Sequence, residues 1–403
     1  MKVVGLVTEY NPFHNGHRYH IQQAKAVTGA DVVVAVMSGN FVQRGEPALF
    51  DKWTRAQTAL ENGVDLVIEL PTFYAVQPSH IFAEGAVRLL SAMGIKDMVF
   101  GSEHADVDFL KLAEQAPSVE SGHAFQEKNQ TFAHAYATQL AEETGFVLED
   151  PNDILAFGYA KAVIKLGVDM TLHPIQRVAA GYHDQSFADD QTIASASSIR
   201  LALHKEKLEK VQGVVPEATL KAIAEAPHTI AFEKPFWQLL QYRLMTDTIG
   251  QLGQVYQMAE GLEHRLAAVA LGEPGPKNYQ SFIKSVKSKR YTFARMQRTL
   301  LYTLLNIKVD QMQAAMQDPY LRILGFTDAG QHFLNQIKKT VTLPLISKVD
   351  QNLAKANLRL DYKAGKIWQL LANEPGQQQD VTRQPIHVTG QKRADRGETN
   401  EIS

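Results

Sequence analysis

Three histidines stand at intervals of three residues just after the first apolar segment of the chain: His14, His17 and His20. His14 and His17 flank Gly16 in the sequence His-Asn-Gly-His, between a short β-branched run and a helical pattern. A helix N-terminus offers free N–H groups and the positive end of the helix dipole, and glycine lets the backbone approach a ligand closely. Two imidazoles there can donate hydrogen bonds to phosphate oxygens whose charge grows during displacement at phosphorus. The spacing therefore predicts a phosphate site.

Two other interpretations of these histidines stay open on the spacing alone. They could be ordinary loop and helix-surface residues, since the His-x-Gly-His pattern is short. They could also ligate a metal, because three histidines recur at a fixed spacing. The chain has no cysteine, and the segment lies where a parallel sheet forms its ligand crevice, so a nucleotide is favoured over a metal.

A second polar group lies later in the same half of the chain. Ser197, Ser198 and Arg200 stand at the start of a predicted helix, where a serine commonly serves only as a cap. A loop rich in hydroxyl and basic groups can also close over phosphates. We expect Ser198 and Arg200 to act beside His14 and His17 in this way.

The elements that must position these residues alternate between strand and helix patterns. Apolar runs that are typical of strands occupy residues 3–7, 31–36, 64–70 and 97–100, with helical patterns between them. Near-continuous apolar strands indicate a parallel sheet covered on both faces. We therefore predict an α/β fold with a Rossmann-like parallel sheet over residues 1–204.

The rest of the chain has a different pattern. Residues 205–372 are amphipathic with a helical period and are broken by proline and glycine, which predicts a separate, mainly α-helical domain. Residues 373–403 have few large apolar side chains and are predicted to be disordered, because they cannot offset their ordering entropy. Within the first half, long helices are expected over 120–145 and 153–166.

A strongly basic stretch lies in the predicted helical domain. Between Asn278 and Arg298 there is no Asp or Glu, and aromatic residues are interleaved with the basic ones. Basic side chains contact phosphates and aromatic rings stack on unpaired bases, so this composition suits single-stranded RNA. The stretch could equally be a solvated helix face whose aromatics belong to the core. Its basic residues are Lys284, Lys287, Lys289, Arg290, Arg295 and Arg298.

Composition excludes several classes of site. The chain has 403 residues, of which 45% are hydrophobic and 21% charged, with a formal net charge of -2 and no cysteine. Disulfides, thiolate zinc sites, iron–sulfur clusters and cysteine nucleophiles are therefore excluded. Its apolar runs are too short for a signal-peptide core or a membrane span. We expect a soluble, cytoplasmic protein without a membrane partner, and the sequence leaves open whether it forms a homodimer.

Several segments together resemble one enzyme family. Glu-Tyr-Asn-Pro-Phe-His-Asn-Gly-His at 9–17 and Ser-Gly-Asn-Phe-Val-Gln-Arg-Gly-Glu-Pro-Ala at 38–48 closely resemble segments of the bacterial tRNA(Met) cytidine acetate ligases. Shorter matches stand at 100–103, 151–153 and 197–200, and the resemblance extends to about residue 370. His-x-Gly-His alone would indicate only the wider nucleotidyltransferase superfamily of HUP-type fold, whereas the segment 38–48 is more particular.

The resemblance implies a two-step reaction. Acetate and ATP would form acetyl-adenylate and pyrophosphate, with Mg²⁺ as the expected counterion, and the acetyl group would then move to N4 of the wobble cytidine of elongator tRNA(Met). His14, His17, Ser198 and Arg200 would stabilise the phosphates, and the basic stretch would bind tRNA. The implied ATP-binding residues are Val7, Thr8, Glu9, Tyr10, Asn11, Pro12, Phe13, His14, Asn15, Gly16, His17, Arg18, Tyr19, His20, Gly101, Asn152 and Arg177.

Three of the assigned residues have further interpretations or no motif of their own. Arg44 lies in the loop after the second strand, where it could bind the acetate carboxylate or a tRNA phosphate, or serve a structural purpose. Asn152 could cap a helix as well as contact the nucleotide. Arg177 has no local motif and is assigned through the resemblance only.

Two other functions stay open beside this ligase. One is an adenylyltransferase for a small phosphate ester, whose product would retain AMP. The other is a non-catalytic, nucleotide-sensing RNA-binding protein, which would bind ATP without releasing pyrophosphate.

Overall fold

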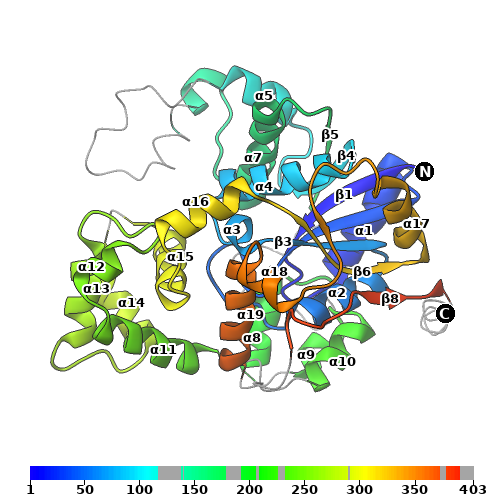
Figure 1. Cartoon of the computed structure of the whole chain (residues 1–403). Coiled ribbons are helices and arrows are strands. Elements are labelled where there is room, and N and C mark those ends of the chain that lie inside the picture. The colour runs from blue at the N-terminus through cyan, green and yellow to red at the C-terminus, as the bar shows by residue number, and fades with distance from the viewer. Residues whose placement is uncertain are drawn as a thin grey trace.

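A parallel sheet lies at the centre of the N-terminal half of the chain (Figure 1). Its strands are β1 (Val3–Thr8), β2 (Val32–Ser38), β3 (Leu66–Leu70), β4 (Asp97–Ser102) and β5 (Thr171–Gln176). β1 pairs with β2 and β4, β2 with β3, and β4 with β5, all in parallel. The computed structural model describes residues 1–116, 138, 140–177, 192–205, 208–225, 232–288, 291–372 and 378–390. The predicted α/β fold with a Rossmann-like parallel sheet is confirmed.

Apolar clusters cover both faces of this sheet. All side chains of β2 are buried and alternate between two clusters: Val32, Val34 and Val36 belong to one, and Val33 and Ala35 to the other. This is the arrangement that a near-continuous apolar run predicts, because successive side chains point to opposite faces. The helices of this half are α1 (Asn15–Thr28), α2 (Lys52–Glu61), α3 (Thr72–Ala75), α4 (Ser79–Ala92), α5 (Phe109–Gln115) and α7 (Pro151–Leu166).

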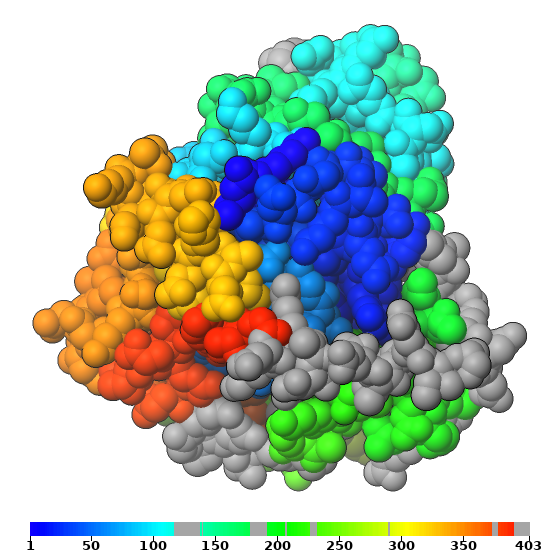
Figure 2. Space-filling model, turned by 90° about the vertical axis from the view of Figure 1, so that its right-hand side faces the viewer, coloured from blue at the N-terminus to red at the C-terminus, as the bar shows by residue number. Residues whose placement is uncertain are grey.

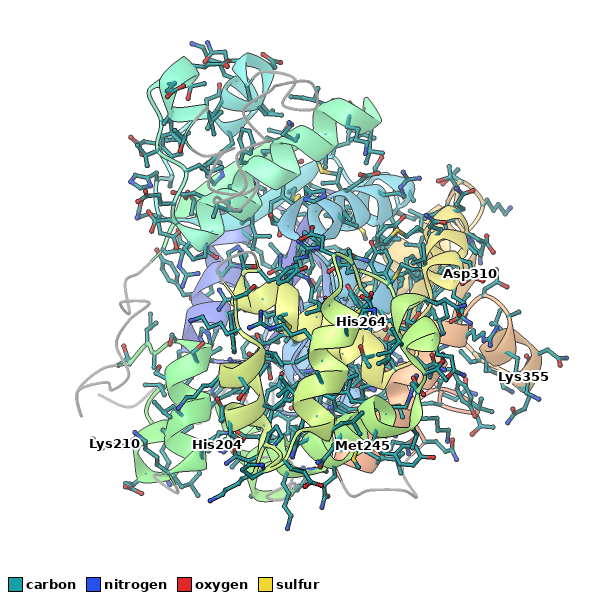
Figure 3. All side chains as sticks on the ribbon, turned by 90° about the vertical axis from the view of Figure 1, so that its left-hand side faces the viewer. His204, Lys210, Met245, His264, Asp310 and Lys355 are labelled. Carbon is teal, nitrogen blue, oxygen red and sulfur yellow. The ribbon has the colours of Figure 1, made fainter. Side chains whose placement is uncertain are left out.

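The predicted helix at 153–166 is confirmed as α7, whereas most of the helix expected over 120–145 lies outside the described residues. Helices also make up most of the chain from 196 to 317: α8 (Ala196–His204), α9 (Leu208–Val211), α10 (Glu217–Glu225), α11 (Glu233–Thr246), α12 (Ile249–Gly253), α13 (Leu262–Leu271), α14 (Tyr279–Val286), α15 (Phe293–Leu304) and α16 (Val309–Gln317). Figure 3 shows the outer side of these helices, with Met245 on α11 and His264 on α13 at the surface. No helix among the described residues has the length and apolar character to cross a membrane.

The predicted helical span 205–372 is wrong in one respect, because the chain returns to the first sheet within it. β6 (Leu321–Thr327) pairs antiparallel with β3, and β7 (Leu345–Ile346) pairs with β6. Six of the seven residues of β6 are buried, so the segment is a core strand with no amphipathic alternation to distinguish it from a short helix. The helices around these strands are α17 (Asp328–Ile337), α18 (Gln351–Lys355) and α19 (Arg359–Leu371).

The predicted disorder of residues 373–403 is also wrong in part. Residues 378–390 are described, and they include β8 (Ile386–Val388), which pairs with β6. Figure 2 shows the orange surface of residues near 330 and the red surface of the C-terminal segment against the blue surface of the N-terminal half. The composition of this tail is polar, but two of its polar side chains, Gln379 and Asp380, are buried with partners.

Those two residues fasten the tail beside α2. Lys52 Nζ lies 2.6 Å from Asp380 Oδ1 and 2.8 Å from Glu69 Oε2, and the side chains of Lys52 and Asp380 are 1% exposed. Gln379 Nε2 donates to Asp51 Oδ2 at 2.9 Å, and Trp53 Nε1 donates to the Gln379 carbonyl at 2.6 Å. A buried charge is tolerated only when it is paired. Lys52 and Asp380 therefore each compensate the buried charge of the other.

We expect Asp380→Ala to lower the free energy of unfolding by about 3 kcal/mol, because breaking a buried pair leaves a charge without full compensation. Chemical denaturation followed by circular dichroism measures the change. Asp169→Ala is the matched control, since Asp169 Oδ2 lies 2.6 Å from Lys96 Nζ but both side chains are exposed, at 82% and 70%. Equal unfolding midpoints for the two variants would contradict the importance of the buried pair.

Candidate active site

A cavity of about 350 Å³ opens at the carboxyl ends of β1, β4 and β5. Between β1 and β4 the order of the strands reverses, which is where open α/β sheets bind their ligands. Most of the implied ATP-binding residues are brought together in its lining: Val7, Thr8, Glu9, Tyr10, Asn11, His14, Gly16, His17, Tyr19, His20, Gly101, Asn152 and Arg177. Gln43, Arg44, Ser195, Ser197 and Arg200 line it as well.

His14 and His17 form the N-terminal cap of α1. The His14 Nδ1 atom accepts from the Gly16 N–H at 3.1 Å, and the His17 Nδ1 atom accepts from the His14 N–H at 3.2 Å. An imidazole whose Nδ1 accepts carries its proton on Nε2. The two rings stack with their centroids 3.7 Å apart, and each keeps an Nε2–H group for a ligand in the cavity. The cap therefore fixes the Nε2–H tautomer of both rings, which can donate a hydrogen bond to a phosphate oxygen.

The electrostatic surroundings keep these histidines neutral. Desolvation, helped by Arg177 and Arg200, lowers the pKa of His14 to about 3. Desolvation and the neighbouring His14 hold the pKa of His17 well below 6.5, and desolvation with Arg177 lowers that of His20 to about 4. The buried Nε2 atom of His20 has no hydrogen-bond partner among the described residues. Neutral rings with an N–H donor can bind an anion without giving up a proton.

Four residues of the 7–20 segment do not line the cavity, and three of them, Pro12, Phe13 and Asn15, are part of the packing and hydrogen bonding of the loop. Phe13 is 1% exposed and packs on Tyr10 with ring centroids 4.7 Å apart, and Pro12 beside it is buried. Asn15 Nδ2 donates to the carbonyls of Thr192 and Gly213, at 2.9 and 3.1 Å. Arg18 is exposed on α1.

Arg200 reaches the same loop from α8. Its Nη1 atom donates to the Asn11 carbonyl at 2.6 Å, and its Nη2 atom lies 3.7 Å from Glu46 Oε2. Ser198 is placed differently from Ser197, because it is 6% exposed, is absent from the lining, and donates through Oγ to the Ser195 carbonyl at 2.8 Å. Ser195 caps α8 and lines the cavity. The composition of the segment alone did not distinguish Ser195 from the other serines.

On the opposite side of the cavity, Glu103 joins two of the implied ATP-binding residues. Asn152 donates to its carboxylate through Nδ2 at 2.6 Å and through its backbone N–H at 3.2 Å. Arg177 Nε lies 3.7 Å from Glu103 Oε1, and the Arg177 side chain packs over Gly101. Arg177 thus belongs to the cavity although no local motif marked it.

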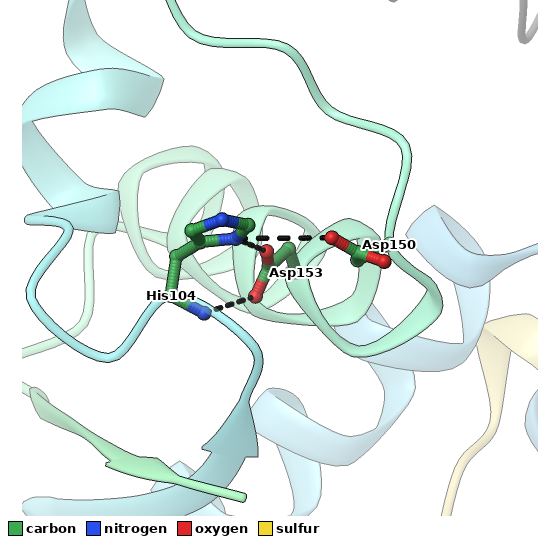
Figure 4. A group of neighbouring side chains, drawn as sticks. All are labelled: His104, Asp150 and Asp153. Carbon is green, nitrogen blue, oxygen red and sulfur yellow. Dashed lines mark hydrogen bonds and ion pairs between the residues drawn. The ribbon is translucent and has the colours of Figure 1, made fainter. Parts of the chain in front are cut away.

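Asp153, one residue beyond Asn152, holds the end of β4. Its carboxylate accepts from Ser102 Oγ at 2.5 Å and from the Glu103 N–H at 2.9 Å, and it lies 2.6 Å from His104 Nδ1 (Figure 4). Asp150 Oδ2 lies 3.8 Å from the same ring, so these three side chains could in principle hold a metal ion. The hydrogen bonds to Asp153 hold the end of β4, so that the Glu103 carboxylate meets Asn152 and Arg177, which line the cavity.

Arg55 was missed by the sequence analysis and is central to the loop geometry. Its buried guanidinium donates to the carbonyls of Glu9 at 2.6 Å, Ser38 at 3.0 Å and Phe50 at 3.0 Å, and also to the Gly39 carbonyl. The sequence around Arg55 gives no sign of this role, because most of its carbonyl partners lie in distant segments of the chain.

The loop after β2 connects the cavity to the helical part. Gln43 and Arg44 line the cavity, and Gly45 has a φ of +84° and lies so close to Arg298 that a Cβ atom there would be 2.8 Å from its backbone nitrogen. Gln297 Nε2 donates to Glu46 Oε1 at 3.2 Å. The start of the basic stretch's second helix, α15, therefore packs on the loop that lines the cavity.

The basic residues of the stretch are not equivalent. Lys284 and Lys287 are exposed at the end of α14, and Arg295 stacks on Tyr291 at 4.7 Å. Arg298 is 7% exposed and packs on the loop, so the solvated-face interpretation does not apply to it. Phe282 in α14 and Tyr291 just before α15 are buried in the core. Lys289 and Arg290 lie outside the described residues.

The chain is similar to proteins of one family over nearly its whole length. The sequence profile of the HIGH nucleotidyl transferase family matches residues 1–383. The chain is 83% identical to the tRNA(Met) cytidine acetate ligase of Leuconostoc citreum, over 96% of this chain and 98% of that protein. It is 71% identical to the enzyme of the same name from Leuconostoc mesenteroides, over 96% and 99%.

Two crystal structures of Thermotoga maritima TmcAL have the same fold. The apo structure has a TM-score of 0.87 and 32% identity, and covers 96% of this chain and 100% of its own. The structure bound with alpha-thio ATP has a TM-score of 0.84 and 30% identity, with the same coverage.

The neutral histidines predict a pH dependence of stability. In the unfolded chain a histidine takes up a proton as the pH falls through about 6.5, whereas the folded pKa values lie lower, so stability is present above pH 6.5 and is lost below it. We expect His20→Gln to remove about 1 kcal/mol of the loss between pH 7 and pH 5, since the ring keeps part of its surface open to the cavity. Urea unfolding at the two pH values measures it, and an unchanged difference would contradict a neutral His20.

Proposed function

The chain belongs to the HIGH nucleotidyl transferase family and, within it, to the tRNA(Met) cytidine acetate ligases, and on this premise we propose how its residues carry out the reaction. In the first step an acetate oxygen attacks the α-phosphorus of ATP, the bond to the β-phosphate breaks, and acetyl-adenylate and pyrophosphate form. In the second step N4 of the wobble cytidine of elongator tRNA(Met) attacks the acetyl carbonyl, and AMP leaves. Because ATP and tRNA are cytoplasmic molecules, we propose that the reaction takes place in the cytoplasm.

The fixed tautomer of His14 and His17 carries the proposal for the first step. Both rings use Nδ1 in the helix cap and line the cavity, so their Nε2–H groups are donors set in place before ATP binds. Donors that need no rearrangement stabilise the charge that develops on the departing pyrophosphate. Arg200 adds a positive charge at the same loop. Ser195 and Ser197, which line the cavity, are better placed for the phosphates than Ser198.

Asn152, Glu103 and Arg177 form the second part of the ATP site. Their contacts with one another, at the ends of β4 and β5 and the start of α7, supply amide, carboxylate and guanidinium groups around Gly101. Such groups suit the hydroxyls and ring nitrogens of a nucleoside, and Gly101 leaves room beside them.

Mg²⁺ is expected to accompany ATP and to neutralise charge on its phosphates. Among the described residues that line the cavity, Glu9 is the carboxylate nearest the phosphate loop, so the ion would be bound mainly by phosphate and water oxygens. The His104 group lies outside the lining and fits this ion less well.

The tRNA is proposed to lie across α14 and the start of α15. The exposed Lys284 and Lys287 and the half-buried Arg295 face solvent there, and Lys289 and Arg290 stand between them in the sequence. α15 packs on the loop that carries Arg44, so tRNA bound at this surface would be close to the cavity mouth. Arg44 lines the cavity beside this surface, and we propose it as a contact for the acetate carboxylate or for a tRNA phosphate.

Acetate-dependent exchange of labelled pyrophosphate into ATP, without tRNA, tests the first step. We expect His17→Asn to lower the exchange rate about 10²- to 10³-fold, because the amide oxygen can keep the cap while the Nε2–H donor is lost. His17→Gln, whose amide nitrogen reaches the Nε2 position, should retain more activity and lose stability instead.

Two results would overturn the assignment. Exchange by the wild-type protein in the absence of any carboxylate would show that acetate is not the group activated. A His17→Asn variant with wild-type exchange would show that the imidazole does not contribute to pyrophosphate departure.

The tRNA surface is tested by Lys284→Ala combined with Lys287→Ala. We expect weaker binding of tRNA(Met) and a salt dependence of log Kd that is shallower by about 1 to 2, since each phosphate contact contributes a slope of nearly one. Filter binding at several salt concentrations measures both, and pyrophosphate exchange without tRNA is expected to be unchanged. Lys338→Ala with Lys355→Ala, two exposed lysines elsewhere on the surface, is the control; an equal loss of binding there would contradict the assignment.

A further inference from the structure

Glu9 is a carboxylate in a place where both substrates of the first step are anions. It follows β1 directly and lines the cavity, and its side chain keeps part of its surface open. Among the described residues it makes no ion pair within 4.0 Å, in contrast to Glu46 and Glu103, which lie near arginines. Neither the acetate carboxylate nor the ATP phosphates gain from a second negative charge beside them.

The position of this carboxylate is fixed from two directions. Glu9 Oε1 accepts from the Gln43 N–H at 2.8 Å, which ties the side chain to the loop after β2. The Glu9 carbonyl accepts from Arg55 Nη1 at 2.6 Å, which ties its backbone to the buried guanidinium. Among the described contacts Oε2 has no partner, so one oxygen is held and the other is left for a ligand.

Glu9 lies between the two regions that the reaction must join. On one side Arg200 binds the carbonyl of Asn11 in the phosphate loop, and on the other Glu46 contacts Gln297 of α15. Both Arg200 and Glu46 act electrostatically on Glu9. A tRNA base that entered from α15 toward the phosphate loop would therefore meet this carboxylate.

The group in the reaction that a carboxylate does recognise is an amine. The exocyclic N4 amine of cytosine is a hydrogen-bond donor, and Glu or Asp is its natural acceptor in base recognition. Uracil presents a carbonyl oxygen at the same position, which a carboxylate would repel. The N4 amine is also a poor nucleophile that must lose a proton when it forms an amide, so an acceptor beside it has a chemical task.

We propose that the Glu9 carboxylate accepts a hydrogen bond from the cytidine N4 amine and removes its proton during acetyl transfer. This rests on the proposed function and assigns its second step. The N4–carbonyl bond forms, the bond between the acetyl carbon and the AMP oxygen breaks with its electron pair going to the AMP phosphate, and the N4 proton passes to Glu9 Oε2. No further reactant is required, and Glu9 returns the proton to solvent after AMP leaves.

The surroundings of Glu9 support proton acceptance. Desolvation raises the pKa of its carboxyl group above 4.5, against the opposing effects of the Gln43 N–H and Arg200, and Glu46 raises it further while Arg55 lowers it. A carboxylate with a raised pKa accepts a proton more readily than an exposed one. Tyr159, whose pKa burial raises, lines the same cavity and adds no charge there.

The test compares the two steps in one variant, Glu9→Gln, which keeps an oxygen for the Gln43 N–H and removes the base. The first step is measured as acetate-dependent pyrophosphate exchange and as acetohydroxamate formed when hydroxylamine intercepts acetyl-adenylate. The second is measured as single-turnover transfer of labelled acetyl from preformed enzyme-bound acetyl-adenylate to tRNA(Met). We expect transfer to fall 10²- to 10⁴-fold and the first step to fall far less, so that their ratio changes at least about 100-fold.

Two further variants make the result specific. Glu9→Asp keeps a carboxylate at a shorter reach and should restore part of the transfer rate that Glu9→Gln loses. Glu84→Gln, which neutralises a carboxylate that pairs with Arg88 and Lys165 away from the cavity, should leave the ratio of the two steps unchanged. Circular dichroism confirms that each variant is folded.

Three outcomes would reject the proposal, and each is distinguishable. Transfer at the wild-type rate by Glu9→Gln would place the proton acceptor elsewhere. An equal loss of exchange and transfer would assign Glu9 to ATP or its Mg²⁺. Absence of acetate-dependent exchange in the wild-type protein would reject the proposed function itself, whatever the variants do.

Discussion

One buried guanidinium sets the geometry on which the site depends. Arg55 donates to carbonyls at the ends of β1 and β2 and before α2, among them those of Glu9, Ser38 and Phe50. Carbonyls at the carboxyl ends of parallel strands point out of the sheet and need partners when they are buried. Desolvation lowers the pKa of Arg55 to about 10, so the group stays charged at neutral pH. A planar fork of donors can tie several loops together at once, which a lysine could not do.

The cavity has two sides because β1 lies between β4 and β2. On the β4 side, Asn152, Glu103 and Arg177 are joined by hydrogen bonds and charge, and Asp153 fixes them to the strand end. On the β2 side, Glu9 is tied to the loop of Gln43 and Arg44, and that loop packs on the helix α15 through Gly45. A reaction that activates one substrate and then transfers it to a large acceptor needs a cavity that the two substrates can enter from different sides. The reversal of strand order at β1 provides such a cavity.

The sequence predicted the parts of this structure whose signals are local. The alternating strands and helices follow from short patterns, as does a helix that begins beside Gly16. β6 was missed because a short buried run between helices has no period of its own. The order of residues 378–390 was missed because composition cannot show that Asp380 meets Lys52 far along the chain. Ser198 was assigned by its place in a motif, while the structure turns its hydroxyl back to the cap.

The return of the chain to its first sheet also concerns how the protein is made. During synthesis β3 is an unpaired edge of the sheet until the ribosome has produced β6, and Lys52 has only Glu69 until Asp380 emerges. Exposed edges and unfinished cores are the surfaces through which nascent chains associate wrongly. The N-terminal half therefore completes its fold only after residue 380 has been synthesised. A ribosome that stops after the helical part would release a chain whose sheet still has an unpaired edge. Chaperones and proteases would recognise such a chain before it could bind ATP.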